Sequence, residues 1–386
     1  MRVAIATDIF RPQLSGVADS IDALTAALVA AGHTVRAYAP RVGGAEADPN
    51  VRRLVSVSVP GSGGGLAVVM PFGALRDLRR FRPDVIHVHT FAAVGLLAVY
   101  ASRRLGVPLV GTDHTFPADY LHYLKLDFAA ARRWSKRMAA WFYDRCDLVT
   151  APSRILIDEL RRSGMESDAT VISNPIASDR FRPLERRDAL KRKLGIGPEA
   201  VVLFGRIAVE KNLDMTIDVF AGVAERRRVE LVVIGDGPER PAFEQRMAER
   251  NLGDRCRMLG ELHGEPLNEA INACDVFMTT SKSETQSMTM LQAAAAGLPV
   301  VAIRAGGLPE YVVDGQTGYV IDEDNRDRFV TRIIGLIDDR GLARQMGKKG
   351  RQLTMRFTPD AVAAKFVDVY QKAIARQRVE AEERLA

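Results

Sequence analysis

The chain has 386 residues, of which 47% are hydrophobic and 26% are charged, and its formal net charge is +6. This length exceeds what one ordinary core uses and fits two domains, and the composition excludes a disordered protein. No apolar run approaches the roughly 20 residues that a membrane-spanning helix requires.

Short buried strand patterns alternate with helical segments along the whole chain. The first half predicts strands at 3–6, 35–38, 85–88, 109–111 and 147–149, and a helix at 21–31 that ends at Gly32. Because the N-terminal residues enter a strand directly, we expect no signal peptide. The second half predicts strands at 201–204, 231–234, 276–278 and 300–303. This alternation predicts an α/β fold with two doubly wound parallel sheets.

The pattern breaks at Ser173-Asn174-Pro175-Ile176. We therefore expect an N-terminal domain over 1–174 and a C-terminal domain over 175–357. The loop Gly61–Gly65 lacks the Gly-Lys-Ser/Thr ending of a phosphate loop and is interpreted as a flexible connection. The three scattered cysteines predict buried thiols in a reducing cytosol rather than a disulfide or a zinc site; they are Cys146, Cys256 and Cys274.

The strongest functional signal follows the strand predicted at 276–278. The run Ser283-Glu284-Thr285-Gln286-Ser287-Met288-Thr289-Met290-Leu291-Gln292 opens a helix, where the first backbone N–H groups point at a ligand site. It resembles the donor-sugar site of the retaining GT-B glycosyltransferases of family 4. The resemblance implies that Glu284 binds hydroxyls of the donor sugar. The family places a ribose-binding glutamate eight residues on; here that position is Gln292, whose amide still donates and accepts hydrogen bonds.

The segment Gly205-Arg206-Ile207-Ala208-Val209-Glu210-Lys211-Asn212 follows a strand and opens a helix. A planar guanidinium and an ammonium suit the developing charge of a pyrophosphate. Spacing alone leaves open whether Arg206 and Lys211 share a site or are two solvated cations, and the resemblance implies that they hold the diphosphate. The resemblance extends to further donor-site positions, which are Gly16, Gly237, Met258, Leu259, Ser287, Met288 and Thr289.

Several residues allow more than one interpretation. His114 follows the strand at 109–111; the resemblance implies an active-site histidine that faces the donor sugar, whereas its position alone fits an ordinary hydrogen-bonding residue. His87 and His89 alternate along a strand and are interpreted as structural, and a metal pair lacks a third ligand. Asp322-Glu323-Asp324 fits the Asp-x-Asp pattern of metal-dependent GT-A transferases, but a solvated loop is the favoured interpretation. We expect no metal and no other cofactor.

Glu284 has two interpretations besides sugar binding. It fits the nucleophile of a retaining double displacement, and it also fits a carboxylate at a helix start without catalytic duty. In the family, retention is explained by attack on the same face without a covalent intermediate, and we adopt that interpretation.

The basic excess is concentrated in residues 60–140, which hold eleven Lys and Arg against five Asp and Glu and so carry a net charge of +6. Such a patch attracts a nucleic acid or an anionic membrane. On a helix that starts near residue 128, an apolar arc lies opposite a basic side. The arc holds Phe128, Ala131, Trp134, Met138, Trp141 and Phe142, and the basic side holds Arg132, Arg133, Lys136 and Arg137. This suits an anionic lipid interface; the alternative is a helix packed on its own sheet with a solvated basic face.

The segment 116–125 resembles the acceptor region of diacylglycerol glucosyltransferases, and Tyr120 and His122 are its candidate contacts. In the family the final helix packs back on the first domain, as expected here for about 358–386. The leading hypothesis is a metal-independent, retaining hexosyltransferase that uses a UDP-sugar and a lipid acceptor such as diacylglycerol. It would be cytoplasmic and peripheral, on an anionic membrane surface at the inner face of the cell membrane.

Three rival hypotheses remain. The first keeps the fold and changes the substrates, to GDP-mannose as donor or to a soluble or polyprenol-linked saccharide as acceptor. The second is an inactive GT-B-like scaffold, supported by Gln292 and the unusual run at 287–290. The third is a nucleic-acid-binding protein, which ranks last because the sequence has no signature of a nucleic-acid-binding module. We therefore expect no nucleic-acid partner.

Overall fold

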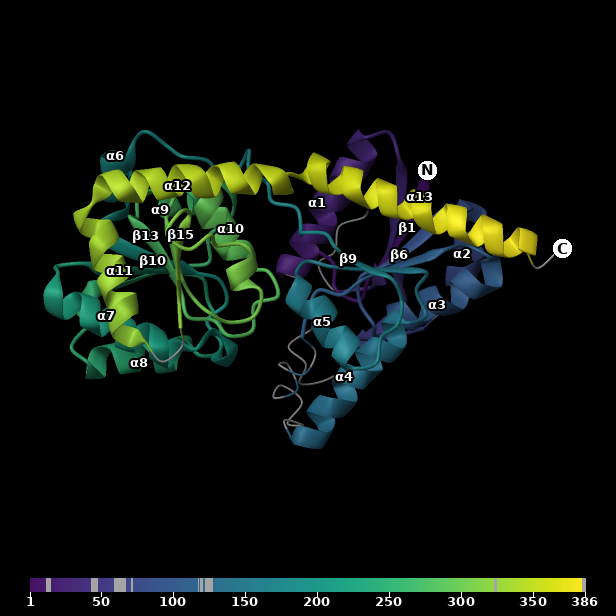
Figure 1. Cartoon of the computed structure of the whole chain (residues 1–386), viewed down its shortest axis with the longest axis horizontal. Coiled ribbons are helices and arrows are strands. Elements are labelled where there is room, and N and C mark those ends of the chain that lie inside the picture. The colour runs from purple at the N-terminus through teal and green to yellow at the C-terminus, as the bar shows by residue number, and fades with distance from the viewer. Residues whose placement is uncertain are drawn as a thin grey trace. The chain divides into compact units, whose positions relative to one another are not determined.

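The computed structural model describes residues 1–11, 15–42, 48–58, 67–70, 72–116, 118, 121, 128–322 and 325–383. The chain divides into two compact units (Figure 1). Unit 1 comprises Met1–Pro175 and Pro359–Ala386, and unit 2 comprises Ile176–Thr358. Each unit is described by itself below.

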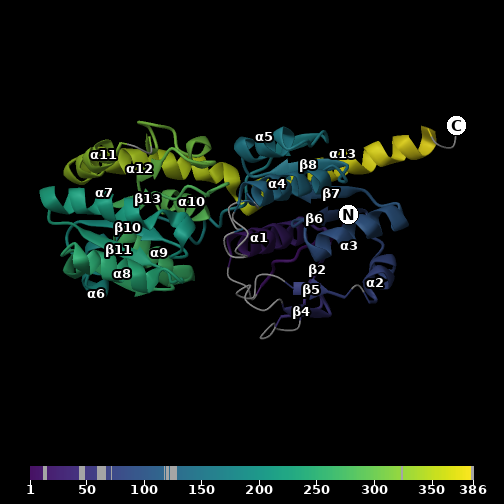
Figure 2. The same ribbon diagram turned by 90° about the horizontal axis from the view of Figure 1, so that it is seen from below.

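Unit 1 contains a parallel sheet of seven strands in the order β3-β2-β1-β6-β7-β8-β9. The strands are β1 (Arg2–Ala6), β2 (Thr34–Pro40), β3 (Val51–Leu54), β6 (Val85–Val88), β7 (Leu109–Thr112), β8 (Leu148–Ala151) and β9 (Ala169–Val171). The antiparallel pair β4 (Ser56–Ser58) and β5 (Ala67–Val69) forms a separate small sheet, seen in the lower part of Figure 2. The order of strands reverses between β1 and β6, so the loops after these two strands meet at the carboxyl edge of the sheet.

Helices cover both faces of this sheet, and alternate residues of β1 show why. Val3 and Ile5 pack in one core with α1 and α13, whereas Ala4 and Ala6 belong to a second core that includes residues of α3 and α4. The helix α13 adds Phe366 and other apolar side chains to the first of these cores. The helices of unit 1 are α1 (Gly16–Ala30), α2 (Ala74–Phe81), α3 (Ala93–Leu105), α4 (Ala129–Tyr143), α5 (Arg154–Arg162) and α13 (Pro359–Glu383).

Unit 2 contains a parallel sheet of six strands in the order β12-β11-β10-β13-β14-β15. The strands are β10 (Ala200–Phe204), β11 (Glu230–Ile234), β12 (Cys256–Gly260), β13 (Val276–Thr279), β14 (Val300–Ile303) and β15 (Gly318–Ile321). The helices are α6 (Arg187–Leu194), α7 (Leu213–Arg226), α8 (Arg240–Glu249), α9 (Gly264–Asn272), α10 (Met288–Ala295), α11 (Arg326–Asp338) and α12 (Arg340–Thr354). Short 3₁₀ turns are η2 (Val209–Lys211), η3 (Gly253–Arg255), η4 (Leu308–Glu310) and η5 (Met355–Phe357).

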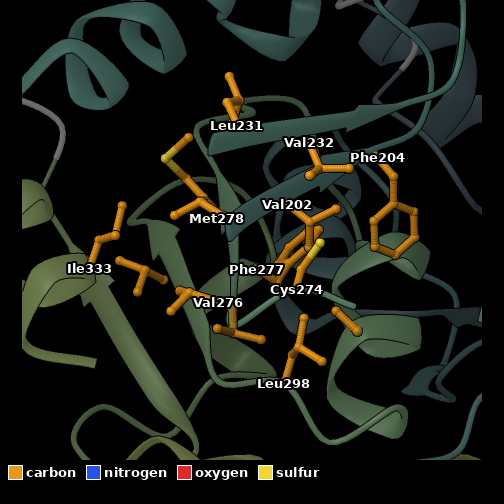
Figure 3. Packing of buried hydrophobic residues seen from close by; sticks show 14 of the residues in the cluster. Val202, Phe204, Leu231, Val232, Cys274, Val276, Phe277, Met278, Leu298 and Ile333 are labelled. Atoms are coloured by element: carbon orange, nitrogen blue, oxygen red, sulfur yellow. The ribbon is translucent and has the colours of Figure 1, made fainter. Parts of the chain in front are cut away.

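One continuous apolar core stabilises unit 2. Figure 3 shows Val202, Val232 and Phe277, from three neighbouring strands, packed near Cys274 and Leu298. All five side chains are buried, as expected for a parallel sheet that is covered on both faces. Here the strand order reverses between β10 and β13, so the loops that follow these two strands meet at the carboxyl edge.

The structure corrects some details of the predicted elements. The helix predicted at 21–31 begins earlier, at Gly16, because the Ser15 side chain accepts a hydrogen bond from the Ala18 N–H and caps it. Strands β3, β9 and β12 were not predicted; each is an edge or short strand without a continuous buried pattern. Within the described residues, no helix has both the length and the apolar character needed to cross a bilayer.

Candidate functional site

Three of the predicted charged residues lie at the carboxyl edge of the unit 2 sheet, where the strand order reverses. Arg206 lies in the loop after β10, Lys211 ends the turn η2, and Glu284 lies in the loop between β13 and α10. The Lys211 ammonium lies 2.6 Å from the Glu284 carboxylate, across 73 residues of sequence. Open α/β sheets bind ligands at this position, so the ion pair marks the candidate site.

The Glu284 carboxylate is charged at neutral pH although it is largely enclosed. Its side chain is 13% exposed and that of Lys211 is 31% exposed. Burial works to raise the pKa of Glu284, but the charge of Lys211 and hydrogen bonds from Lys211 and Ser287 outweigh it and hold the pKa below its usual value. The site therefore offers a fixed hydrogen-bond acceptor for hydroxyl groups.

The backbone around Lys211 is fastened to the end of β13. The Thr280 hydroxyl is within hydrogen-bond distance of the Lys211 and Asn212 carbonyl oxygens and lies 2.6 Å from the Thr216 hydroxyl. Asn212 adopts a left-handed conformation with φ of 55° and is the cap residue that precedes α7. Asparagine tolerates this conformation better than most residues, which allows the turn from η2 into the helix.

A glycine turn also holds the backbone of Glu284. The Gly307 N–H donates a hydrogen bond of 2.7 Å to the Glu284 carbonyl oxygen. A Cβ atom on Gly306 would lie 2.2 Å from that same oxygen, so the turn approaches Glu284 more closely than any other residue type allows. The loop then enters α10, whose cap Ser287 accepts a hydrogen bond from the Met290 N–H. The N–H groups of this first turn have no partner within the helix and suit an anionic ligand.

Two further glycines bring the loops after β10 and β11 together. A Cβ atom on Gly235 would lie 2.1 Å from the Gly205 carbonyl oxygen, and one on Gly237 would lie 2.2 Å from the Ile207 carbonyl oxygen. The structure thus places Gly237 beside the loop that carries Arg206. The Arg206 guanidinium is paired with Glu210, which belongs to the same turn as Lys211.

The remaining predicted donor residues surround this edge of unit 2. The half-buried residues Met258 and Leu259 lie in β12 and pack against the core. Thr289 lies next to Gly205, since a Cβ atom on that glycine would be 3.3 Å from the Thr289 methyl carbon. Met288, Thr289 and Gln292 are half-buried on α10, and their spacing of three and four residues places them on one face of the helix.

In unit 1, Gly16 and His114 lie at the carboxyl edge of the sheet. Gly16 is the first residue of α1, and His114 follows β7 with 6% of its surface exposed. Burial lowers the pKa of His114 to about 4, although the nearby Asn174 side chain works to raise it. At neutral pH the ring is therefore uncharged and acts as a hydrogen-bonding group rather than as a cation.

The contacts of His87 agree with its interpretation as a structural residue. Its Nδ1 lies 2.7 Å from the Tyr370 hydroxyl, and its Nε2 lies 2.6 Å from the Thr112 hydroxyl. Burial lowers the pKa of His87 to about 3. The ring therefore ties β6 to α13 and to β7 as a neutral group.

Because His87 is buried as a neutral group, we predict that the free energy of unfolding of unit 1 decreases in acid. The unfolded chain binds a proton on His87 below about pH 6.5 while the folded chain does not, so stability falls as the pH decreases from there. We expect wild type to lose about 2 kcal/mol more than His87→Gln between pH 7.5 and pH 5. Denaturant unfolding followed by tryptophan fluorescence measures this in unit 1, since Trp134 and Trp141 both lie there. Equal losses in the two proteins would contradict the prediction.

The helix α4 packs differently from the prediction. Its buried face is formed by Ser135, Ala139, Ala140, Phe142 and Tyr143. Trp134 and Trp141, which were placed on one apolar arc with Phe142, are 64% and 43% exposed. The reason is that small side chains allow α4 to approach its neighbours along a different face. The helix does pack on its own domain with Arg133 and Arg137 exposed, as the alternative hypothesis has it, but of the predicted apolar arc only Phe142 is fully buried.

The basic residues of α4 have different environments. Lys136 forms an ion pair with Glu159 of α5, whereas Arg133 and Arg137 are exposed. Arg132 is half-buried. The predicted acceptor contacts Tyr120 and His122 lie outside the described residues.

The Asp-x-Asp segment begins with Asp322, which forms an ion pair with Arg304 at 2.6 Å. The other two residues of that pattern lie outside the described part of the chain. Among the residues that the structure describes, no three His, Cys, Asp or Glu side chains gather as a metal site. Metal independence stays a prediction.

Comparison with known proteins identifies the chain. The family model described as "Glycosyltransferase Family 4" matches residues 14–180, and the model described as "Glycosyl transferases group 1" matches residues 186–353. An alpha-monoglucosyldiacylglycerol synthase of Streptococcus pneumoniae is 30% identical over 78% of this chain and 71% of that protein. The chain belongs to glycosyltransferase family 4. The predictions of the family and of a glycosyltransferase are thus confirmed.

Other relatives of this family 4 glycosyltransferase differ in their named substrates. The alpha-monoglucosyldiacylglycerol synthase of Acholeplasma laidlawii is 26% identical over 96% of both chains. A GDP-mannose-dependent alpha-mannosyltransferase of Mycobacterium tuberculosis is 30% identical over 83% of this chain and 84% of that protein. Among solved structures, Anabaena HepE in complex with UDP covers 96% of this chain and 100% of that one, with 19% identity and a TM-score of 0.78. This likeness confirms the predicted GT-B fold.

Sequence reasoning missed several residues that shape the site of this glycosyltransferase. Thr280 and Glu210 were not singled out, because their partners are set by loop geometry rather than by a motif. The pair Gly306-Gly307 follows the strand predicted at 300–303, and a Gly-Gly dipeptide after a strand is a turn signal that identifies it. His89 was interpreted as structural, although it contacts His114.

Proposed function

We propose that this enzyme transfers a hexose from a UDP-sugar to a lipid hydroxyl, with retention of configuration and without a metal. The observation that carries the proposal is the Lys211–Glu284 ion pair at the carboxyl edge of unit 2, next to the glycine-lined loops after β10 and β11. The names of the two synthases support a lipid acceptor.

The site residues divide the work by their chemistry. Glu284 accepts hydrogen bonds from sugar hydroxyls, and Lys211 has further N–H donors for a phosphate oxygen. Arg206 stabilises the charge that develops on the departing diphosphate, together with the first-turn N–H groups of α10. Gln292 contacts the ribose, and neutral His114 acts as a hydrogen-bonding group at the reaction centre. The donor phosphate itself takes the proton of the acceptor hydroxyl.

The exposed stripe of α4 supports the lipid side of the proposal. Trp134 and Trp141 protrude from the same helix as the exposed Arg133 and Arg137. Tryptophan favours the boundary between water and lipid, and arginine is attracted to anionic head groups. We infer that α4 rests on an anionic membrane, which would place the enzyme at the membrane surface on the side where nucleotide sugars occur.

Removing the aromatic stripe should release the protein from lipid. We expect Trp134→Ser/Trp141→Ser to bind phosphatidylglycerol-containing liposomes at least about tenfold more weakly in a flotation assay. Arg133→Glu/Arg137→Glu should weaken binding mainly at low salt, since it removes electrostatic attraction. The control is Arg228→Glu, an exposed arginine of unit 2, which should bind like wild type. Unchanged binding in both double variants would contradict the membrane role.

The enzymatic test combines purified protein, anionic liposomes carrying diacylglycerol, and a panel of UDP- and GDP-sugars with and without EDTA. The proposal expects one UDP-sugar to be consumed, a glycolipid with retained anomeric configuration to form, and EDTA to have no effect. Loss of activity in EDTA that Mg²⁺ restores would overturn metal independence. Absence of turnover and of any thermal shift with all donors would favour the inactive scaffold.

A second candidate is a GDP-mannose-dependent mannosyltransferase, because the relative with that name is as similar as the lipid synthases. The same panel separates the two functions, since only one nucleotide should be consumed. Competition by free UDP and free GDP gives a second, acceptor-independent measurement of the preferred base.

A further inference from the structure

Two buried threonine hydroxyls join the end of β13 to the beginning of α7 in unit 2. The Thr280 Oγ1 atom lies 2.6 Å from the Thr216 Oγ1 atom, although 64 positions separate the two residues in the sequence. Thr280 is 1% exposed and Thr216 is 3% exposed. Because buried hydroxyl groups are nearly always hydrogen-bonded, the atoms around this pair indicate what it holds.

Two backbone carbonyl oxygens lie next to this pair. Thr280 Oγ1 is 3.1 Å from the Asn212 carbonyl oxygen and 3.3 Å from the Lys211 carbonyl oxygen. The Asn212 carbonyl oxygen also accepts a hydrogen bond of 3.2 Å from the Thr216 N–H at the beginning of α7. The Thr280 hydroxyl therefore connects the two peptide groups that flank Asn212.

These contacts determine which hydroxyl donates to which oxygen. A carbonyl oxygen only accepts, so the single Thr280 O–H points towards the two carbonyl oxygens, of which that of Asn212 is nearer. The same O–H cannot also point at Thr216, so the Thr216 O–H donates to Thr280 Oγ1 over 2.6 Å. The opposite assignment would leave oxygen lone pairs facing each other at 3.1 Å inside the protein. The donors thus run from Thr216 through Thr280 to the backbone at Lys211 and Asn212.

The Thr280 hydroxyl supports a backbone conformation that is uncommon for a residue with a side chain. Asn212 has φ of 55° and ψ of 53°. Such a conformation persists where the surrounding structure fixes it, and a donor to the carbonyl oxygens on both sides of Asn212 fixes both of its peptide planes. Lys211 directly precedes this residue, so the same contact fixes the direction in which the Lys211 side chain leaves the turn.

The segment that holds the backbone of Lys211 also holds its ammonium group. Thr280 and Glu284 both lie in the loop between β13 and α10, four positions apart. Thr280 contacts the Lys211 carbonyl oxygen, and the Glu284 carboxylate lies 2.6 Å from the Lys211 ammonium. One loop therefore fixes both ends of the lysine, and the ion pair depends on the backbone contact.

We propose that Thr280 is a positioning residue, whose hydroxyl holds the turn at Lys211 and Asn212 so that the Lys211 ammonium meets the Glu284 carboxylate. Its effect on transfer rests on the proposed function, in which Lys211 binds a phosphate oxygen of the donor. The direction of the hydrogen bonds predicts how substitutions rank. Thr280→Ser keeps the hydroxyl, Thr280→Val keeps the shape and removes it, and Thr216→Val removes only the group that donates to Thr280.

The first test needs no substrate. Reductive methylation with ¹³C-formaldehyde labels the ten lysines and keeps their charge, and the Lys211 side chain is 31% exposed and open to the reagent. The Lys211 signal is assigned by its absence in Lys211→Arg. We expect this signal to shift in Glu284→Gln and to shift in the same direction in Thr280→Val, with a smaller shift in Thr216→Val and none in Thr280→Ser. An unchanged Lys211 signal in Thr280→Val would overturn the proposal.

A second buried threonine provides the matched control for this test. The Thr354 hydroxyl donates to the Arg351 carbonyl oxygen at 2.7 Å at the end of α12, and Thr354 is 0% exposed. Thr354→Val therefore removes the same kind of buried donor elsewhere in unit 2 and should leave the Lys211 signal unchanged. A shift in Thr354→Val as large as that in Thr280→Val would show a general response to a lost buried hydroxyl and would overturn the proposal.

The second test measures transfer by the same variants. We expect Thr280→Val to lower kcat about 10- to 100-fold, Thr216→Val to lower it less, and Thr280→Ser to recover most of the loss. In a Lys211→Met background, Thr280→Val should cost less than about threefold more, because its effect passes through Lys211. Equal losses with and without Lys211 would assign Thr280 a purely structural role and overturn the proposal. If wild type turns over no donor, the proposed function fails, and the spectra still decide the positioning role.

Discussion

Glu284→Gln is expected to lower kcat/KM by about 10²- to 10³-fold, because loss of one preorganised polar group from an active site costs about 2.7–4 kcal/mol of transition-state stabilisation. The amide keeps the size of the side chain and removes the charge that Lys211 faces at 2.6 Å. Lys211→Met should have a loss of similar size, because it leaves the carboxylate without its cation. Steady-state kinetics with saturating acceptor measures both.

The experiment also includes the double variant of the site pair and a control variant in an ion pair far away in the sequence. If the two residues act as one unit, Glu284→Gln/Lys211→Met loses much less than the product of the two single losses. The control is Asp338→Asn, which breaks an ion pair with Arg227 whose members are both more than 40% exposed. Such a pair contributes at most about 1 kcal/mol to stability, and its loss should leave kcat/KM unchanged. Full activity in Glu284→Gln would refute the role of the carboxylate.

Gly306→Ala is expected to reduce activity about 100-fold or more and to lower the melting temperature. The new Cβ atom would lie 2.2 Å from the Glu284 carbonyl oxygen, so either the glycine turn or the Glu284 loop must shift. The position has φ of +51°, which adds strain for any residue with a side chain. A displacement of about 1 Å at a positioned group costs about 10²-fold in rate. Kinetics and thermal unfolding of the purified variant measure the two effects.

Gly315→Ala is the matched control for this variant. Gly315 also has a positive φ, of +71°, but a Cβ atom there would meet nothing within 4 Å. The Gly315→Ala variant should therefore lose about 1–2 kcal/mol of stability and retain activity. Similar kinetics in the two variants would show that close contact with Glu284 does not matter.

Sequence patterns predicted the parallel sheets because their central strands are continuous apolar runs, such as Val201–Phe204. They predicted Glu284 because its motif is local, within one loop and one helix start. The contact of that residue with Lys211 spans 73 positions and depends on the order of the strands. Edge strands such as β12 were not predicted, because they are only half-buried and lack a distinctive sequence pattern.

Helix α4 shows a different limit of sequence reasoning. The helical wheel gave the amphipathic pattern correctly, but it did not show which face packs inward. Ser135 and Ala139 are small enough for close packing, and their burial leaves both tryptophans on the outside. Hydrophobicity alone ranks a tryptophan stripe as core, whereas the distance that neighbouring elements can approach depends on side-chain size.

The helix α13 comes after unit 2 in the sequence and yet supplies Val362, Phe366 and Tyr370 to the core that contains α1 and one face of β1. During synthesis, the ribosome therefore delivers the seven strands of unit 1 long before the helix that covers them. Unit 2 is contiguous in the sequence, so all residues of its core are synthesised before α13. Until α13 has been synthesised, α1 alone of these two helices can cover this sheet face, so the nascent chain exposes part of its apolar surface and is prone to aggregation or needs chaperone protection during that interval.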